Sequence, residues 1–179
     1  MSTPRPFPRI GRPGAAPTVS TERLTLRPMT LDDWPAYRDT MGSDRSVHMG
    51  GPFALNAAWA MFTSDIAGWH LTGAGALAID AGRTTVGQAV LNDIPAFPDL
   101  ELGWMLYDGH EGQGYATEAA AALLDWARVE LTPPSLVSYV APGNQRSAEV
   151  ARRIGGIEDA AAPRPEPETL VFRHLGEAA

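Results

Sequence analysis

The alternation of apolar and polar residues identifies the strand candidates in this chain. The clearest is residues 100–107, in which every second residue from Leu100 to Leu106 is apolar, a period of two that indicates a strand. A hairpin is predicted where two further stretches flank the turn at Gly82. The predicted strands lie at residues 21–29, 75–80, 84–91, 100–107, 136–140 and 168–174.

Apolar residues three and four positions apart predict the helices. The second helix carries one such face, made of Ala58, Phe62, Ile66 and Trp69. Small residues on the inner face of the third helix would let it pack close to a sheet, and Asn144 can cap the last one. The predicted helices lie at residues 31–41, 55–69, 115–130 and 144–154.

The order of these elements predicts the fold class. From residue 100 onward the chain runs strand, glycine-rich turn, helix, strand, helix, which is typical of a locally parallel sheet in an α/β (α+β) protein. A length of 179 residues argues for one domain, which we place at residues 21–179. Residues 1–20 contain five prolines, and we expect a flexible or loosely docked arm without secondary structure.

Two amino acids are missing from the chain, and their absence excludes several chemistries. There is no cysteine, which excludes disulfides, thiolate zinc sites and cysteine nucleophiles. All 14 residues counted as lysine or arginine are arginines, which excludes a lysine Schiff base and a P-loop lysine. The four histidines show no metal-ligand spacing, and we predict no metal.

Charge is unevenly distributed along the chain. The formal net charge is −7, and the three arginines in residues 1–20 leave residues 21–179 with −10. An acidic body repels phosphate backbones and attracts cations, so nucleic acid is disfavoured and an amine is favoured. No apolar run approaches the ~18 residues of a membrane span, and no secretory leader is recognisable. We therefore expect a cytoplasmic protein.

The strongest local feature is the glycine-rich turn Glu111–Thr117 (EGQGYAT), which lies between a predicted strand and helix. Such a turn directs free backbone N–H groups toward one point, where the helix dipole also favours negative charge. Gly112 and Gly114 would let a ligand approach the main chain closely. The turn indicates a phosphate or pyrophosphate site, although a tight connection without a ligand fits the same residues. Thr117 stands where a dinucleotide fingerprint needs its third glycine, which disfavours a nicotinamide cofactor.

Five short blocks follow one another between residues 21 and 174. They are Thr21–Pro28 (TERLTLRP), Val86–Gly87, Glu101–Leu106 (ELGWML), Gly112–Ala119 (GQGYATEA) and Asn144–Gly155 with its Asn-x-x-Ser and Arg-Ile-Gly. In this combination the chain resembles the GNAT superfamily of acetyl-CoA-dependent N-acetyltransferases, and most closely the ribosomal-protein-alanine N-acetyltransferase branch. The resemblance implies a mixed sheet of six to seven strands with about four helices.

The resemblance also implies where acetyl-CoA binds. The pyrophosphate would contact the glycine-rich turn, and the pantetheine arm would lie beside a splayed strand that often carries a bulge. The implied contacts are Trp104, Met105, Leu106, Gly112, Gln113, Gly114, Tyr115, Ala116, Thr117, Asn144 and Ser147. Two residues depart from the family pattern, because Glu111 replaces the Gln or Arg that begins the pyrophosphate motif and Ala151 replaces a tyrosine that many members use as an acid.

Acetyl transfer needs a neutral amine, so a proton must leave an α-amine of pKa ~7.7–8 or a lysine amine of ~10.4. Glu101 occupies a position where this branch often has an acid, and we predict it as the general base, with His110 as the alternative. If Glu101 has only a structural role, we expect it to face solvent and to form a salt bridge. A backbone N–H near Met105 would polarise the thioester carbonyl. Ser147 is a candidate contact for the departing thiolate, and a main-chain bond in its helix fits its hydroxyl equally well.

These observations predict an enzyme that moves acetyl from acetyl-CoA to a primary amine by direct attack in a ternary complex. The branch favours a protein or peptide α-amine, and a small-molecule amine is the alternative acceptor. A non-catalytic acetyl-CoA-binding sensor or interaction module is another alternative, motivated by Glu111 and Ala151. Dimers are frequent in the family, so a homodimer is compatible with the resemblance, whereas nucleic-acid and membrane partners are not expected.

Overall fold

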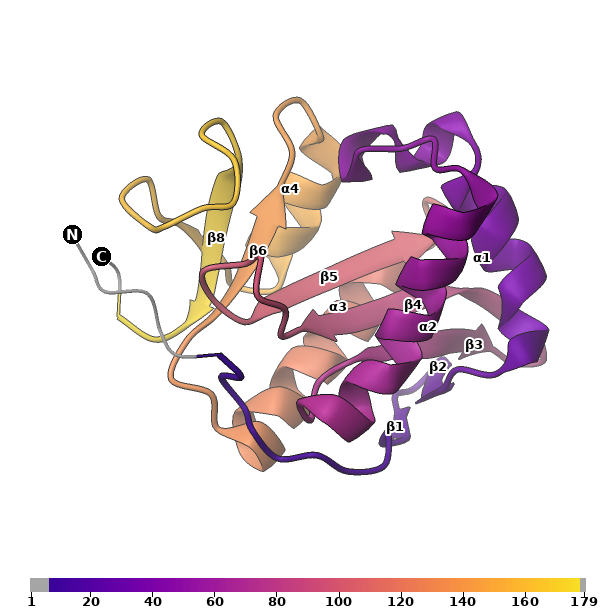
Figure 1. Ribbon diagram of the computed structural model, residues 1–179, viewed down its shortest axis with the longest axis horizontal. Coiled ribbons are helices and arrows are strands. Elements are labelled where there is room, and N and C mark those ends of the chain that lie inside the picture. The colour runs from indigo at the N-terminus through magenta and orange to yellow at the C-terminus, as the bar shows by residue number, and fades with distance from the viewer. Residues whose placement is uncertain (1–6, 178–179) are drawn as a thin grey trace.

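The computed structural model describes residues 7–177, which form one sheet with helices on both of its faces (Figure 1). The strand order is β1-β2-β3-β4-β5-β6-β8-β7. The six predicted strands are all present, and the two others are two-residue edge strands that are too short for a period of two to reveal. The bounds are β1 (Val19–Ser20), β2 (Leu24–Pro28), β3 (Ala76–Ala81), β4 (Thr84–Asn92), β5 (Glu101–Leu106), β6 (Leu136–Val140), β7 (Ile157–Glu158) and β8 (Leu170–Leu175).

The four predicted helices are also present, with one change at the end of the third. The α-helices are α1 (Trp34–Met41), α2 (Leu55–Leu71), α3 (Tyr115–Trp126) and α4 (Gln145–Arg153), and the short helices are η1 (Leu31–Asp33), η2 (Asp44–Met49) and η3 (Ala127–Leu131). The third predicted helix continues beyond Trp126 as the π-helical turn η3, which ends at Thr132 in the left-handed conformation. No helix within residues 7–177 is long and apolar enough to cross a membrane.

The helices divide between the two faces of the sheet (Figure 1). Helices α1 and α2 cover one face, where Tyr37 and Phe62 pack with Met105 of β5. Helix α3 covers the other face, where Leu123 packs with Leu102 of β5. Odd-numbered residues of β5 therefore face α1 and α2, and even-numbered residues face α3. Both faces of the central strand are consequently buried or half-buried.

The sheet divides between β5 and β6. Strands β4 and β5 pair without a register shift from Gly87↔Leu106 to Asn92↔Glu101, so the predicted alternation holds through Leu106 and the expected bulge is absent. By contrast, the parallel pairing of β5 with β6 is limited to Glu101↔Val137. Beyond this point the two strands diverge, as Figure 1 shows, and we call the region the fork.

The N-terminal segment differs from the sequence expectation. Val19 and Ser20 form β1 against β2, so the assignment of residues 1–20 to a segment without secondary structure is wrong at these two positions. Further upstream, the Arg9 N–H and guanidinium donate to Asp93 at 2.7 and 2.8 Å. Arg9 also donates to backbone carbonyls of residues 94, 97 and 98. Arg9 thus docks the N-terminal segment on the loop after β4, through the buried Asp93 and nearby carbonyls; residues 1–6 lie outside the described residues.

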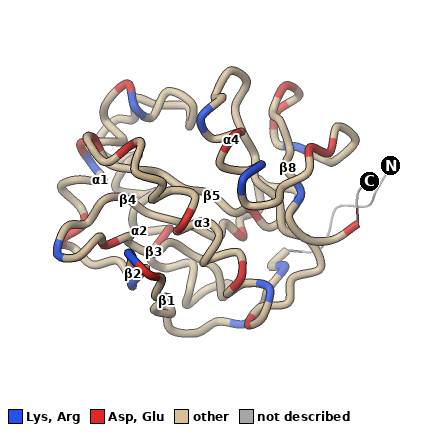
Figure 2. Tube along the Cα trace, turned by 180° about the vertical axis from the view of Figure 1, so that it is seen from behind, with Lys and Arg blue, Asp and Glu red and all other residues tan. Residues whose placement is uncertain are grey.

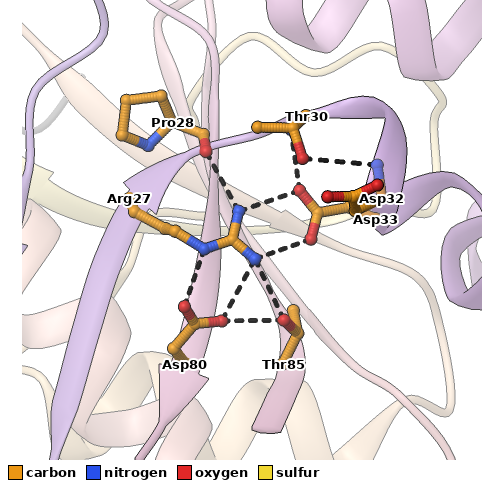
Figure 3. Close-up of polar contacts among 7 residues, drawn as sticks. All are labelled: Arg27, Pro28, Thr30, Asp32, Asp33, Asp80 and Thr85. Carbon is orange, nitrogen blue, oxygen red and sulfur yellow. Dashed lines mark hydrogen bonds and ion pairs between the residues drawn. The ribbon is translucent and has the colours of Figure 1, made fainter. Parts of the chain in front are cut away.

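Arg27 of β2 joins three segments around the start of α1 (Figure 3). Its guanidinium donates to Asp80 on β3 at 2.7 Å, to Thr85 on β4 at 3.0 Å, and to both carboxylate oxygens of Asp33 in η1 at 2.8 and 2.9 Å. Asp33 is only 3% exposed and also accepts the Thr30 N–H. Figure 2 shows basic and acidic positions adjoining at β2 and β3. The pairing supplies the buried Asp33 with a counter-charge and hydrogen bonds to both of its oxygens.

Candidate active site

The fork presents main-chain groups of β5 that lack a neighbouring strand. The carbonyl oxygen of Leu100 still accepts the Val137 N–H of β6 at 3.0 Å. One pleat further, the Leu102 carbonyl accepts the Ser138 hydroxyl at 2.6 Å instead of a backbone N–H. At the open end, the Leu106 carbonyl accepts a guanidinium N–H of Arg45 at 2.9 Å. The carbonyls of these even-numbered residues therefore point toward β6 and the gap.

The register limits which backbone N–H near Met105 could be the expected oxyanion donor. The Tyr107 N–H donates to Val86 on β4 at 2.8 Å, and Gln88 pairs directly with Met105. Because main-chain groups in an antiparallel ladder alternate in direction, the Met105 N–H points toward β4 and away from the gap. The N–H groups that face the gap in this part of β5 belong to Trp104 and Leu106. An oxyanion donor near Met105 is therefore one of these two neighbours.

The glycine-rich turn has the geometry of an anion cradle. Gly112 and Gly114 both have φ of 79°, a left-handed conformation that side-chain-bearing residues rarely adopt. A Cβ built on Gly112 would meet no atom within 4 Å, so the approach to its main chain is open. The first intrahelical bond of α3 is donated by Glu118 to Gly114, which leaves the N–H groups of residues 115–117 without helical acceptors. The predicted turn thus presents free donors at a helix N-terminus.

Arg23, in the turn between β1 and β2, braces this cradle. Its guanidinium donates to the Gln113 carbonyl at 3.0 Å and to Glu118 at 2.7 Å, and it lies 5.2 Å from the Tyr115 ring centroid. The Glu118 carboxylate also accepts the Thr21 hydroxyl at 2.5 Å. The block that begins at Thr21 is therefore in contact with the glycine-rich block, although about 90 residues separate them in the sequence. Sequence patterns gave no signal for this contact.

Glu111, which departs from the family motif, is neutralised by a second arginine. Arg45 of η2 forms ion pairs with Glu111 and with Asp108, the latter at 3.1 Å. Although desolvation opposes it, hydrogen bonds from its own backbone N–H and from Arg45 hold the pKa of Glu111 below its ordinary value. The negative charge at the start of the cradle is therefore balanced by a positive one. The sequence analysis missed Arg45, because its place beside the cradle depends on the path of the chain between α1 and α2.

Glu101 lies at the point where the fork opens. Its side chain is 9% exposed and accepts the Asn92 amide N–H at 2.6 Å. Burial raises the pKa of Glu101 to about 7, hydrogen bonds from Asn92 and the Tyr139 N–H oppose this shift, and the charge of Asp65 adds to it. The interpretation as a solvent-facing residue in a salt bridge does not fit this burial. Glu101 is placed to exchange a proton near neutral pH.

A second carboxylate lies on the same side of the sheet. Asp65 of α2 accepts the Tyr37 hydroxyl at 3.1 Å and the Gln88 amide N–H at 3.3 Å. Burial raises the pKa of Asp65 to about 6, against the lowering effect of Gln88 and Tyr37. On the predicted face of α2, Ala58, Phe62 and Trp69 are buried and Ile66 packs against the core, and Asp65 stands three positions after Phe62 and four before Trp69. An acidic residue within the apolar stripe of a helix was the sequence signal that could have identified Asp65 as a candidate site residue.

The start of α4 supports the cap predicted for Asn144. Its side chain accepts the Ser147 N–H at 3.2 Å. Ser147 is half-buried in the first turn of α4, on the segment that follows β6. Ala151 is fully buried against Val140 and Phe172, so the position where many family members carry a tyrosine is packed into the core. Contacts of Asn144 and Ser147 with acetyl-CoA remain predictions, and His110 lies in the turn before the cradle.

A serine–histidine pair at the fork is structural in its geometry. Ser138 lies 2.9 Å from His174 Nε2, but its hydroxyl is donated to the Leu102 carbonyl. Burial lowers the pKa of His174 to about 4, so the ring is neutral at physiological pH. A serine that donates to a carbonyl is not activated as a nucleophile. The pair bridges β6 and β5 where their ladder ends.

The family model for the acetyltransferase (GNAT) domain matches residues 23–157, about three quarters of the chain. The chain belongs to the GNAT family. The family expected from the five sequence blocks is therefore confirmed, and with it the mixed sheet and the class of enzyme, an acetyltransferase. The match includes β2, the fork, the glycine-rich turn and all of α4.

Individual relatives agree with this assignment. A crystal structure of an acetyltransferase from Agrobacterium tumefaciens is 56% identical, with a TM-score of 0.86 over 90% of this chain and 95% of that one. The Bacillus subtilis uncharacterized N-acetyltransferase YnaD is 27% identical over 76% of this chain and 81% of its own length. The B. subtilis uncharacterized protein YkkB is 41% identical, but the match covers only 31% of this chain and 33% of YkkB.

The fold is also shared with an acetyltransferase that has been crystallised with its coenzyme. RimL, a ribosomal L7/L12 α-N-protein acetyltransferase in complex with coenzyme A, has a TM-score of 0.71 and is 17% identical, over 91% of this chain and all of RimL. At this identity the likeness concerns the fold.

Proposed function

We propose that this protein transfers the acetyl group of acetyl-CoA to a primary amine by direct attack in a ternary complex, with a protein or peptide α-amine as the favoured acceptor. The observation that carries the proposal is Glu101, a buried carboxylate of raised pKa at the point where β5 and β6 separate. A general base for an ammonium needs a pKa near the working pH. In a merely structural position, the same acid would more often be paired with an arginine or exposed.

Residues of this chain would hold acetyl-CoA at two places. The open N–H groups at the start of α3, with Gly112 and Gly114 before them, fit the negative pyrophosphate. Main-chain groups of Trp104 and Leu106 face the gap of the fork, where a pantetheine amide would find partners. When bound, acetyl-CoA supplies an activated acetyl group as a thioester. Gln113, Tyr115, Ala116, Thr117 and Asn144 complete the set of proposed contacts.

Proton transfer assigns the other roles. Glu101 accepts one proton from the acceptor ammonium, which frees the nitrogen lone pair to attack the carbonyl carbon. An N–H of Trp104 or Leu106 stabilises the charge on the carbonyl oxygen. The carbon–nitrogen bond forms, the carbon–sulfur bond breaks, and the second amine proton goes to the departing thiolate. The Ser147 hydroxyl is the proposed contact for that thiolate, and Glu101 returns its proton to water.

The proposed α-amine acceptor is supported by the resemblance to the ribosomal-protein branch and by the fold shared with RimL, which acts on a protein α-amine. The formal net charge of −7 also favours a cationic acceptor over an anionic one. A small-molecule amine remains the alternative, so the acceptor panel must contain both classes.

The test is the release of free thiol from acetyl-CoA in the presence of peptides with free N-termini, polyamines or aminoglycosides. Because the chain contains no cysteine, a thiol-reactive dye sees no protein background. We expect acceptor-dependent thiol release, with the acetyl group on the α-amine by mass spectrometry and no release with Nα-acetylated peptides. Binding of acetyl-CoA without acceptor-dependent release would contradict the proposal and favour a non-catalytic module.

A further inference from the structure

Asp65 differs from the other inward-facing aspartates in what surrounds it. Asp33 pairs with Arg27, Asp93 with Arg9, and Asp159 with Arg173, all at 2.8 Å. Asp65 has no arginine or histidine partner within the part of the chain that the structure describes, and its hydrogen-bond donors are the neutral groups Tyr37 and Gln88. Both donate to the same oxygen, Oδ2. The site is therefore one positive charge short of the pattern followed elsewhere in the molecule.

Asp65 is more exposed than its buried neighbours on α2. It belongs to the sheet-facing stripe of α2, where Ala58, Phe62 and Trp69 are at most 3% exposed, yet Asp65 itself keeps partial exposure. The aromatic side chains around this stripe contact one another. Tyr37 and Phe62 meet edge to face, with their ring centroids 5.2 Å apart. A carboxylate held in such a wall without a counter-charge is costly unless a cation arrives.

One buried polar atom without a hydrogen-bond partner adjoins Asp65. Gln88 is 7% exposed and uses its amide N–H on Asp65, while its Oε1 has no partner. Tyr107, further along the same face of β5, is 5% exposed, and its hydroxyl oxygen also has no partner. Buried polar groups are ordinarily satisfied, so the orphan on Gln88, beside an acid that lacks a counter-charge, indicates a missing ligand group.

The missing group is a primary ammonium. An ammonium has three donors and no acceptor, and the wall offers the free carboxylate oxygen of Asp65 and the Gln88 Oε1 as acceptors. An anion would meet a negative charge and a second acceptor. Glu101 lies on the same face of β5, and the charge of Asp65 makes a minor contribution to its raised pKa.

We propose that Asp65, with Gln88 Oε1, binds the protonated amine of the acceptor and thereby selects cationic primary amines before Glu101 removes the proton. The inference rests on the proposed function and adds the residue that recognises the acceptor. The charged and titratable groups that face Asp65 are Tyr37 from α1 and Tyr107 and Glu101 from β5, and Gln88 of β4 is neutral. The positive charge of Arg27 acts on Tyr107 but is paired with Asp33 and Asp80, and no positive group within residues 7–177 contacts Asp65, which leaves that role to the acceptor.

The experiment compares Asp65→Asn with the wild-type chain. Asparagine has nearly the same shape and can still accept from Tyr37, so only the charge is removed. We expect the KM for an amine acceptor to rise at least ~10-fold at pH 7.5, the affinity for acetyl-CoA to stay unchanged, and kcat to change less than KM. Asp125→Asn is the matched control, because Asp125 is 70% exposed on α3 and pairs with Arg128. An unchanged KM in Asp65→Asn would overturn the inference while leaving the proposed function intact.

A binding measurement keeps the inference testable if turnover is absent. Calorimetry on the coenzyme A complex of the full chain would use spermidine and a free hexapeptide as probes, with the Nα-acetylated hexapeptide as the uncharged comparison. We expect the wild type to bind at least one free amine ten-fold more tightly than the acetylated peptide, and Asp65→Asn to lose that preference. Equal binding of charged and acetylated probes by the wild type would contradict the inference. The melting temperature of each variant and partial rescue by Asp65→Glu distinguish lost charge from lost fold.

Discussion

Two groups of carboxylates, one around Arg27 and one formed by Asp65 and Glu101, differ in the partners that surround them. Around Arg27, each carboxylate meets a guanidinium at 2.7 to 2.9 Å, and the cluster joins β2, β3, β4 and η1 (Figure 3). Around Asp65 and Glu101, the carboxylates meet neutral donors, and burial raises the pKa of both. In the first cluster each carboxylate therefore has a counter-charge, and in the second neither has one.

The second cluster is left able to change its charge. A carboxylate paired with an arginine stays ionised far below neutral pH, whereas one held by amides and hydroxyls in a buried place gains or loses a proton near neutrality. Sites that do proton chemistry require the second arrangement. The contrast therefore separates the scaffold of this acetyltransferase from the part that we propose does its chemistry, although both are built from the same residue types.

The largest expected effect is that of Glu101→Gln. Removing the proposed base should lower kcat roughly 100- to 1,000-fold at pH 7.5, because general base catalysis contributes that much in comparable enzymes. Acetyl-CoA affinity should hold, and turnover of the wild type should rise with pH through about 7, the pKa of Glu101. Steady-state kinetics from pH 5.5 to 9 would show both effects. Glu149→Gln, an exposed change on α4, is the control, and a Glu101→Gln variant with wild-type kcat would remove Glu101 from the mechanism.

The free energy of unfolding should fall as pH rises, whereas turnover should increase. The pKa of Glu101 rises from an ordinary 4.5 to about 7 in the folded chain, and that of Asp65 from 3.8 to about 6. The folded state therefore holds protons that the unfolded state has released, and its free energy of unfolding falls as pH rises from about 4 to 7. Urea denaturation at pH 4.5 and 7.5 should show Glu101→Gln gaining up to about 3 kcal/mol over the wild type at the higher pH only. An equal difference at both pH values would mean that the glutamate is not desolvated.

Arg27→Ala should act on stability alone. It leaves Asp33, which is 3% exposed, without its counter-charge, and breaking a buried pair from one side is strongly destabilising. Because Arg27 is itself 27% exposed, we expect a loss of roughly 2 kcal/mol rather than the larger values seen for fully buried pairs. Arg153→Ala, which removes an exposed pair on α4, should change the free energy of unfolding by less than about 0.5 kcal/mol. A stable Arg27→Ala with low kcat would place the arginine in the active site instead.

The comparison also shows what could be predicted from the sequence. Patterns along the chain located the strands that are longer than two residues, and apolar residues three or four positions apart located the α-helices. Burial on a sheet face or along a helix stripe imposes such periods. The strands Val19–Ser20 and Ile157–Glu158 carry no period, since two residues cannot show one. The glycine-rich turn was visible because its chemistry is local.

The candidate site was less accessible to sequence reasoning for a physical reason. Glu101 came from family resemblance, and its raised pKa depends on burial that no pattern reports. The apolar pattern of α2 located Phe62 and Ile66, but such a pattern counts only apolar residues and so did not reveal that Asp65 also contacts this side of the sheet. Arg23 and Arg45 reach the cradle across about 90 and 60 residues of chain, so their contacts exist only after folding. The direction of the Met105 N–H likewise follows from strand pairing alone.

The smallest effect is expected at the Arg45–Glu111 pair beside the cradle, where an arginine balances an acid close to the proposed ligand site. Both side chains are 32% exposed, so their attraction is weakened by water and salt. Arg45→Ala should weaken acetyl-CoA binding about 5-fold, because it uncovers the charge of Glu111 next to the proposed pyrophosphate site. Glu111→Gln should leave binding within about 3-fold of the wild type, and the double variant should recover most of the loss. Calorimetric titration with acetyl-CoA at low and high salt measures the affinity of the wild type, the two single variants and the double variant. If Arg45→Ala and the double variant bind equally weakly, Arg45 acts directly on the ligand, and Glu111 only holds it in place.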